Sequence, residues 1–192
     1  EYGTSHANYG QHIEKSPLNF VANDTIAIKM INDDNLYYQH NLRRSSHKHE
    51  VAINGDRKIY ATEIFVNVKK STSDEVYMTI QKESRGKSRY YANRNAENIN
   101  YNYTVTNNEI VLDAFYISAY QNKWKEEDVK VTLYIPENIT VYFDSSTKGF
   151  LSNVNNTTDT YDRDMARHYF LMTKEGLHSK ELEELEEIEK ED

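Results

Sequence analysis

The sequence contains no cysteine, only two prolines and six glycines, and no long hydrophobic run among its 192 residues. Without cysteine, neither disulfides nor thiolate metal sites are available, so redox chemistry indicates no cellular compartment. No run approaches the ~18 apolar residues of a membrane span. The chain has no glycine-rich phosphate loop, no G-x-S-x-G motif and no H-E-x-x-H motif. These absences argue against an enzyme, and we expect no cofactor.

The chain also has no basic stripe. Its formal net charge is −8, and its acidic residues are concentrated at the C-terminal end. Residues 179–192 carry eight acids and two lysines, a charge of −6, which leaves −2 for the rest of the chain. Without a basic stripe, a nucleic-acid partner would lack its main electrostatic attraction. We therefore expect no nucleic-acid binding.

Tyrosine is what the sequence has in quantity, with sixteen residues against six phenylalanines and one tryptophan. A tyrosine ring can pack against its neighbours while its hydroxyl reaches water, which favours sheets with partly solvent-exposed faces. The length is typical of one domain, and 38% hydrophobic residues suffice for a packed core. We predict a single mainly β domain over residues 1–178, with an irregular arm at residues 1–16 and an acidic helical tail at residues 179–192.

Alternating side chains predict strands at several places along the chain. The runs are residues 25–31, 36–41, 51–53, 59–68, 75–81, 100–105, 109–115, 129–135, 140–143 and 168–172. Asn54-Gly55 is typical of a hairpin turn. The pattern predicts a mainly β fold, as a β-sandwich or a short β-roll of solenoid-like character.

Two segments have helical rather than alternating periodicity. Within residues 88–99, Ala92, Ala96 and Ile99 share one helical face able to pack on a sheet, and Ser88 is the expected N-cap. In the acidic tail, apolar residues recur every three positions, at Leu182, Leu185 and Ile188. This spacing indicates a helix with a thin apolar edge. The edge could pair two chains, but one heptad is too short to associate strongly by itself, so packing on the domain's own surface is the preferred interpretation.

Metal ligation is one candidate chemistry. His47 and His49 are two positions apart, so on a strand both imidazoles would point the same way and could share an ion. The alternative is a basic, solvated loop together with Arg43 and Arg44, which could also contact anionic lipid. Two ligands do not complete a metal site, and we favour the solvated loop.

Carboxylates provide two further candidates. Asp159, Asp162 and Asp164 resemble an oxygen-rich calcium loop but lack the EF-hand spacing, so a polar turn is the preferred interpretation. Glu137 and Asp144 could form a glycosidase pair, which requires two acids a few ångströms apart. Any acidic protein offers such pairs, and we favour no catalytic role.

Binding is expected, if anywhere, at aromatic and basic side chains. Trp124 has lysines on both sides, and an anchor that closes the sheet is the preferred interpretation over a platform for a sugar. Arg85 precedes the predicted helix, whose N-terminal amides could hold an anion. Tyr101 and Tyr103 alternate on a predicted strand. We treat these four residues as the candidate binding residues.

Five ordered landmarks carry a resemblance to a known family. They are Ser84-Arg85-Gly86-Lys87-Ser88, Ile99-Asn100-Tyr101-Asn102-Tyr103, Lys123-Trp124-Lys125, VTLYIPENITVYFDSS and YDRDMARHYFLMTKEGL. Over roughly residues 76–177 the chain resembles the C-terminal extracytoplasmic domain of PspC-type (phage shock protein C) membrane proteins of Bacteroidetes. The paired strands around Pro136 are also similar to the repeats of β-solenoid adhesin domains, although the repeat occurs about once here.

The resemblance implies a non-catalytic periplasmic or cell-envelope domain, linked to envelope stress and anchored to the inner membrane in the full-length protein. It implies sensing or scaffolding, either with an envelope protein partner or through self-association. Membrane attachment is expected only through segments absent from this chain. The alternative is an adhesin-like module that binds a glycan or another surface ligand, which predicts an exposed Trp or Tyr platform. A hydrolase has the least support.

Overall fold

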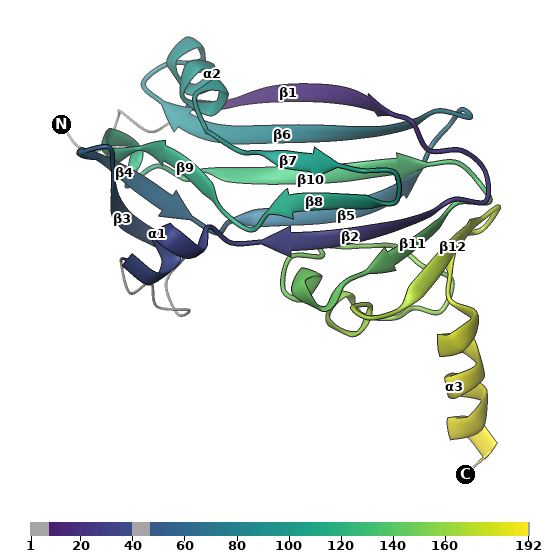
Figure 1. Ribbon diagram of the computed structural model, residues 1–192. Helices are drawn as coiled ribbons and strands as arrows, with labels where there is room; N and C mark the ends of the chain where they lie inside the picture. The colour runs from purple at the N-terminus through teal and green to yellow at the C-terminus, as the bar shows by residue number, and fades with distance from the viewer. Residues whose placement is uncertain (1–7, 40–46, 192) are drawn as a thin grey trace.

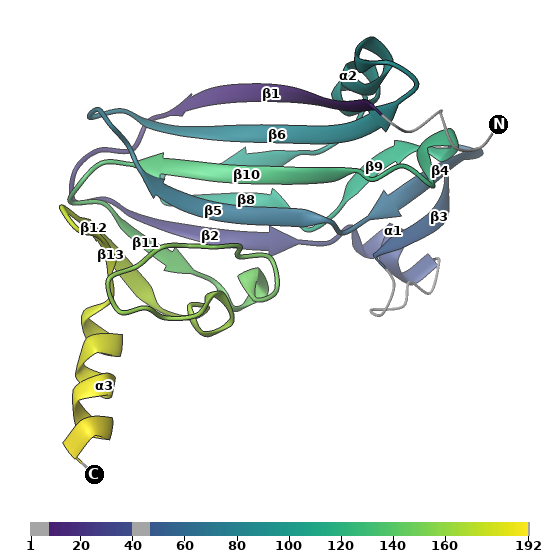
Figure 2. The same ribbon diagram turned by 180° about the vertical axis from the view of Figure 1, so that it is seen from behind.

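The computed structural model describes residues 8–39 and 47–191, with the side chains of residues 37–39 excepted. Within these residues the chain forms thirteen strands in three sheets, as Figures 1 and 2 show from opposite sides. Two larger sheets face each other, and the smaller third sheet extends from one end of them. The mainly β, solenoid-like prediction is therefore confirmed.

Each sheet is built from the following strands, in spatial order from one edge to the other. Sheet A consists of β1 (Asn8–Leu18), β6 (Val76–Gly86), β10 (Asp128–Ile135) and β5 (Ile64–Lys70). Sheet B consists of β13 (Gly176–His178), β12 (Tyr169–Thr173), β11 (Thr140–Phe143), β2 (Thr25–Ile31), β8 (Glu109–Asp113) and β7 (Tyr103–Val105). Sheet C consists of β3 (Lys48–Ile53), β4 (Asp56–Ala61) and β9 (Tyr116–Ala119).

The core lies between sheets A and B. In β10 every second side chain is buried, and the same alternation in β2 buries Ile26, Ile28 and Met30. Because successive side chains of a strand point to opposite faces, one apolar set per strand suffices to join the two sheets. The outward-facing positions carry the half-exposed tyrosines, for example Tyr77 and Tyr134, whose rings stack 4.5 Å apart.

Two corners lead the chain from sheet A to sheet B in the same way. One connects β1 to β2 and the other connects β10 to β11, and β2 and β11 pair in parallel. Asn23 and Asn138 occupy equivalent places, both with positive φ (74° and 71°), and the Asn23 amide donates to the Asn138 carbonyl at 2.8 Å. Asparagine tolerates this left-handed backbone better than most residues. The stacked corners give the domain its solenoid-like character.

Sheet C has a small core of its own. Val51 and Tyr60 are buried, and the Tyr60 ring stacks on Phe115 at 4.9 Å. Asn54 and Gly55 both have positive φ, as the tight turn between β3 and β4 requires, so the predicted hairpin turn is confirmed.

Three α-helices accompany the sheets, namely α1 (Asp34–Gln39), α2 (Arg89–Glu97) and α3 (Lys180–Glu191). Helix α2 packs across β1 and β6, with Ala92 and Ala96 buried as predicted and with Ser88 as its N-cap. Its close approach depends on glycine, since a Cβ at Gly10 or Gly86 would lie 2.4 or 2.5 Å from the backbone of Ala92.

Helix α3 projects from the end of sheet B, away from the body (Figure 1). Ser179 is buried before it, and its hydroxyl accepts the Leu182 amide at 3.4 Å. Only Leu182 packs partly against the core, and none of the described side chains of α3 is buried. The predicted acidic helix is confirmed, but the expected packing of its apolar edge on the domain's own surface is wrong beyond Leu182, because Leu185 and Ile188 are exposed.

Three local predictions were wrong. Residues 8–18, expected to belong largely to an irregular arm, form β1 and pair with β6 along their whole length. The predicted long strand 59–68 divides at Thr62 and Glu63, so that β4 joins sheet C and β5 joins sheet A. The predicted strand 36–41 overlaps α1, where Asp33 accepts the Leu36 amide at 3.1 Å; residues 40 and 41 lie outside the described residues.

The corner at Asn138 provides a direct stability test. Replacing Asn138 by Ala should lower the free energy of unfolding by about 1 kcal/mol, because alanine is strained at positive φ, whereas Asn138→Gly should change it by only a few tenths. The side chain of Asn138 is exposed, so lost packing does not contribute. Urea titrations of both variants measure the difference. An equal loss in both variants would contradict the backbone explanation.

Candidate functional site

Exposed aromatic rings paired with cations gather at the end of the molecule that carries α2. Four cation–ring pairs are present, with distances to the ring centroid of 4.2–5.8 Å: Arg85 over Tyr9, Lys87 over Tyr91, Arg94 over Tyr90, and Lys123 over Trp124. We call these eight residues the aromatic–basic end. Such pairs are favourable and hold both partners in defined orientations.

Separate elements bring these side chains together. Tyr9 and Arg85 lie on the adjacent strands β1 and β6, and Tyr90 belongs to α2. Trp124 follows the short 3-10 helix Tyr120–Asn122, and Figures 1 and 2 both place that segment at the same end as α2. The Arg85 guanidinium forms an ion pair of 3.1 Å with Glu126 and so connects β6 to the loop that carries Trp124.

A buried carboxylate supports that loop from below. Glu127 is 5% exposed, and it accepts hydrogen bonds from the hydroxyls of Ser84 (2.8 Å) and Ser118 (2.6 Å). Burial raises the pKa of Glu127, against the effect of these two hydrogen bonds. The Lys48 ammonium donates to the carbonyl of Lys125 at 2.5 Å. Sheets A and C are thereby connected beneath an otherwise exposed tryptophan.

The outer face of sheet A carries a second candidate, a groove of about 520 Å³. Its lining combines the aromatic rings of Phe65 and Tyr134 with polar groups from neighbouring strands, including Gln81, Asp128 and Lys130. Convergent polar groups beside aromatic rings are typical of ligand sites. Figure 2 shows the face of sheet A on which the groove lies.

A carboxyl pair lies at one end of this groove. Asp128 on β10 is directly opposite Glu83 on β6, and the two side chains share a hydrogen bond. Burial, followed by the interaction with Glu83, raises the pKa of Asp128 to about 7. Burial alone would raise the pKa of Glu83 too, but hydrogen bonds led by that from the Tyr9 hydroxyl lower it. At neutral pH Asp128 is therefore protonated in about half of the folded molecules, whereas Glu83 stays ionised.

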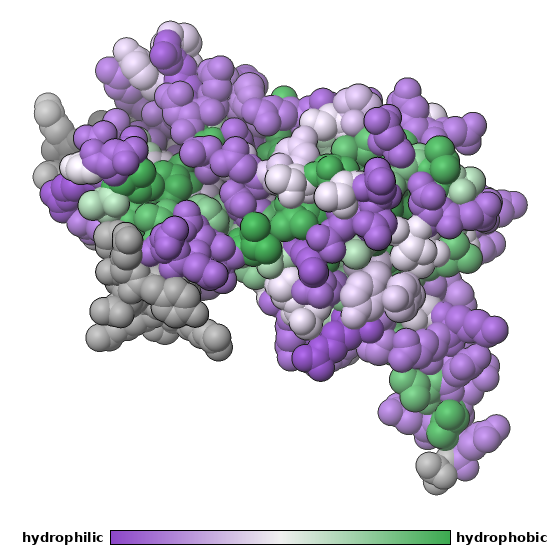
Figure 3. Space-filling model, in the orientation of Figure 1, coloured by the Kyte–Doolittle hydropathy of each residue, from purple (hydrophilic) through white to green (hydrophobic). Residues whose placement is uncertain are grey.

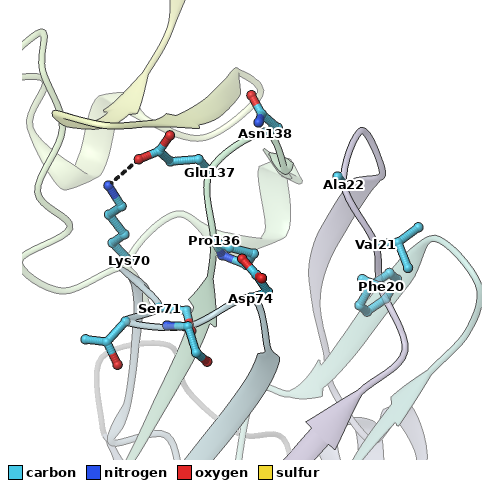
Figure 4. A pocket seen from close by; sticks show the side chains of 11 residues that line it. Phe20, Val21, Ala22, Lys70, Ser71, Asp74, Pro136, Glu137 and Asn138 are labelled. Atoms are coloured by element: carbon cyan, nitrogen blue, oxygen red, sulfur yellow. Dashed lines mark hydrogen bonds and ion pairs between the residues drawn. The ribbon is translucent and has the colours of Figure 1, made fainter.

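A third hollow, of about 610 Å³, lies among the turns at the opposite ends of the strands (Figure 4). The β1–β2 turn, the β5–β6 turn and the corner at Pro136 form its walls. Lys70 crosses one side, where its ammonium pairs with Glu137 at 2.8 Å and donates to the carbonyl of Lys174 at 3.1 Å. These contacts tie turns together, and we assign this hollow no ligand.

The structure separates the four predicted binding residues into two groups. Trp124, which is 80% exposed, and Arg85 belong to the aromatic–basic end, so the anchor interpretation of Trp124 is wrong. Tyr101 is 6% exposed and packs in the core, where burial raises the pKa of its hydroxyl. Tyr103 packs against the core, and its hydroxyl donates to Ser16 at 2.9 Å. Tyr101 is therefore shielded from a ligand, whereas Tyr103 is half-buried.

The metal candidates occupy structural positions. His47 precedes β3 with its Nδ1 atom 3.4 Å from the Thr62 hydroxyl, and His49 lies in β3 opposite Tyr60. Arg43 and Arg44, the other residues of the expected basic loop, lie outside the described residues. Across residues 8–39 and 47–191, no group of three or more His, Asp or Glu side chains is arranged to hold a metal ion. That holds for the aspartate cluster as well as for the histidines.

The proposed acidic pairs likewise have local roles. Asp162 accepts the backbone amides of Asn153 (2.7 Å) and Val154 (2.9 Å), so it orders a turn. Glu137 and Asp144 lie beyond opposite ends of β11, too far apart to share a glycosidic bond. Hydrogen bonds, to Lys70 and Ser146 respectively, lower the pKa of each, which does not suit a general acid.

Several of the site residues were not found from the sequence. Tyr9 lies in the segment that we expected to be irregular. The tyrosines of α2 lie on the polar face of the predicted helix, and nothing else in the sequence marked them as binding residues. The Glu83–Asp128 pair arises from the register of β6 on β10, which no local pattern predicts. The spacing of Arg94 from Tyr90, one helical turn, could have indicated their contact.

The fold and this site define a solenoid-like β domain with an exposed aromatic and basic surface. A protein-family model described as the ToastRack found in some PspC proteins matches residues 51–184, well over half of the chain. The chain belongs to this family. No curated protein and no solved structure matches it. None of the described helices is long and apolar enough to cross a membrane.

The carboxyl pair predicts how stability depends on pH. The folded-state pKa of Asp128 lies above that of an unfolded aspartate, so the folded protein holds a proton that the unfolded chain releases. The free energy of unfolding should therefore fall as the pH rises through about 7, by about 1 kcal/mol between pH ~6 and ~8. In Asp128→Asn the decline should disappear. Urea titrations across this range measure it.

Asp144→Asn is the matched control, because hydrogen bonds lower the pKa of Asp144 and its titration affects stability only in acid. Its decline above pH ~6 should equal that of the unsubstituted protein. A decline that persists in Asp128→Asn would show that another group releases the proton.

Proposed function

We propose that this chain is a non-catalytic, extracytoplasmic domain of a PspC-type envelope protein, which senses or scaffolds by binding another protein chain through its aromatic–basic end. The observation that carries the proposal is the exposure of large aromatic rings there, including Trp124 at 80% and Tyr90 at 61%. Aromatic residues and arginine are enriched in protein interfaces, where a few such anchors supply most of the binding energy.

The support structure of this end favours recognition over chemistry. Each exposed ring has a cation over its face, so little side-chain freedom remains to be lost on binding. Glu127, the buried acid beneath, is occupied by Ser84 and Ser118 instead of facing a cleft. Family membership supports an envelope location, and periplasmic placement with an inner-membrane anchor is part of the proposal.

A site-specific photocrosslink in cells tests the proposal. A photoreactive amino acid at Tyr90 should give a discrete protein adduct, because this side chain would be covered by the partner. Tyr161 is the matched control, since it is similarly exposed at 70% but lies in the loop after β11. Adducts at Tyr90 and not at Tyr161 are expected. Equal yields at both positions, or no protein adduct at Tyr90, would contradict the proposal.

The second candidate function is an adhesin-like module that binds a glycan, and the groove on sheet A favours it. Tyr134, whose ring stacks on Tyr77, lines this groove together with Asp128 and Gln81, so one groove offers an aromatic ring and hydrogen-bonding groups. Such a site would orient a sugar ring by stacking and by polar contacts.

An NMR titration with an N-acetylated oligosaccharide, monitored through the backbone amide chemical shifts, tests the glycan function. Shifts should concentrate on β5, β6 and β10, and Tyr134→Ala should weaken binding about tenfold. Tyr142→Ala is the matched control, because Tyr142 pairs with Tyr169 on sheet B in a similar ring contact of 4.6 Å. Shifts outside the groove, or equal weakening by both variants, would argue against this function.

A further inference from the structure

We propose that the aromatic–basic end binds the acidic helix α3 of a second copy of this chain, so that the molecules associate head to tail. The inference rests on the proposed function and names the partner of the same surface. It is carried by charge complementarity and by the exposed apolar edge of α3.

Helix α3 presents a concentrated negative charge. It contains seven glutamates and two lysines in twelve residues. Its ion pairs with the body involve the first turn, where Glu181 lies 3.2 Å from His168 and Glu183 lies 3.1 Å from His178. Among the described residues, the glutamates from Glu184 onward form no ion pair with the body of the molecule.

Physical chemistry disfavours such a helix standing alone. Glu183, Glu187 and Glu191 follow one another at four-residue spacing, where like charges repel. A cationic surface against α3 would relieve this repulsion.

The apolar edge of α3 also lacks a cover within its own chain. Leu185 is 48% exposed and Ile188 is 60% exposed. Figure 3 shows hydrophobic atoms on the projecting helix surrounded by hydrophilic ones. A partner that offers aromatic rings as well as positive charge would match both the edge and its acidic surroundings.

The aromatic–basic end offers this combination. Two of its cations, Arg85 and Lys123, are already paired with Glu126 and Glu50, just as Arg57, Lys70 and Lys130 are each paired with a carboxylate. Lys87 and Arg94, by contrast, form no ion pair with any described residue, and each lies over a tyrosine ring of α2. Their charge therefore remains available to an acidic partner, beside rings that can cover Leu185 and Ile188.

The two surfaces cannot meet within one molecule. Figures 1 and 2 show α2 and α3 at opposite ends of the body. The contact therefore joins different patches on two copies, and it allows a reciprocal two-fold dimer as well as rings or open chains. Because both patches are exposed and charged, the association should weaken as salt rises.

Charge reversal in the 192-residue chain tests the inference. Sedimentation velocity at low salt should show concentration-dependent association of the unsubstituted chain. Association should weaken at least about tenfold in a head variant, Lys87→Glu with Arg94→Glu, and equally in a tail variant, Glu184→Lys with Glu187→Lys. A chain carrying all four substitutions should associate again, since the charges are complementary in the reverse sense. The emission of Trp124, the only tryptophan, should shift to shorter wavelength on association.

Lys148→Glu with Arg163→Glu is the matched control, because it makes the same charge change at exposed positions elsewhere. It should associate like the unsubstituted chain. A monomer under all conditions, or a four-substitution chain that stays monomeric, would overturn the inference. Equal weakening by the control would also overturn it, since only net charge would then matter.

The proposed function can be judged separately. A crosslink from Tyr90 to a different envelope protein, together with a monomer in sedimentation, would support the protein-binding function and overturn self-association. Binding of the chain to vesicles of anionic lipid through the aromatic–basic end, without any protein adduct, would overturn both.

Discussion

The dry layer between sheets A and B is the contact on which the rest of the structure depends. Strand β10 contributes Val129, Val131, Leu133 and Ile135 to it, and β2 and β11 contribute the facing aliphatic and aromatic residues. A shift of register by one residue would turn each of these side chains to the outer face. The corners at Asn23 and Asn138 fix the position of sheet A relative to sheet B, because each corner follows a strand of one sheet and precedes a strand of the other.

That layer also decides where binding groups can lie. With the inner faces committed to the core, the polar and tyrosine positions are left to the outer faces and to the ends of the strands. Helix α2 reaches its place only because Gly10 and Gly86 leave room for the backbone of Ala92. It thereby carries Tyr90, Tyr91 and Arg94 to the end of sheet A, beside the loop with Trp124. The aromatic–basic end is thus formed by segments at the ends of strands, which is where binding residues on rigid scaffolds are often found.

The sequence predicted the strands whose two faces differ most. In β10, β11 and α2 apolar and polar positions separate cleanly, and the predicted elements agree with the structure. Strand β1 was missed because its inner face carries Gly10, His12, Glu14 and Ser16, a polar set that an edge strand tolerates. The division between β4 and β5 was missed because alternation continues across the turn.

The site was less predictable than the fold. Trp124 and Arg85 were identified as candidates from their type and neighbours, whereas Tyr101 and Tyr103 resemble surface tyrosines in sequence yet pack with the core. Local sequence does not distinguish the two situations, because both occur on alternating strands. The Glu83–Asp128 pair likewise depends on residues 45 positions apart meeting across a strand pair.

Hydrogen exchange of the 192-residue chain at low and high protein concentration tests the central claim most directly. The account predicts that amides of α3 gain protection with concentration, and that amides of α2 and of the loop around Trp124 gain it over the same range. Protection that leaves both ends unchanged, or that gathers on the outer face of sheet A, would contradict the account.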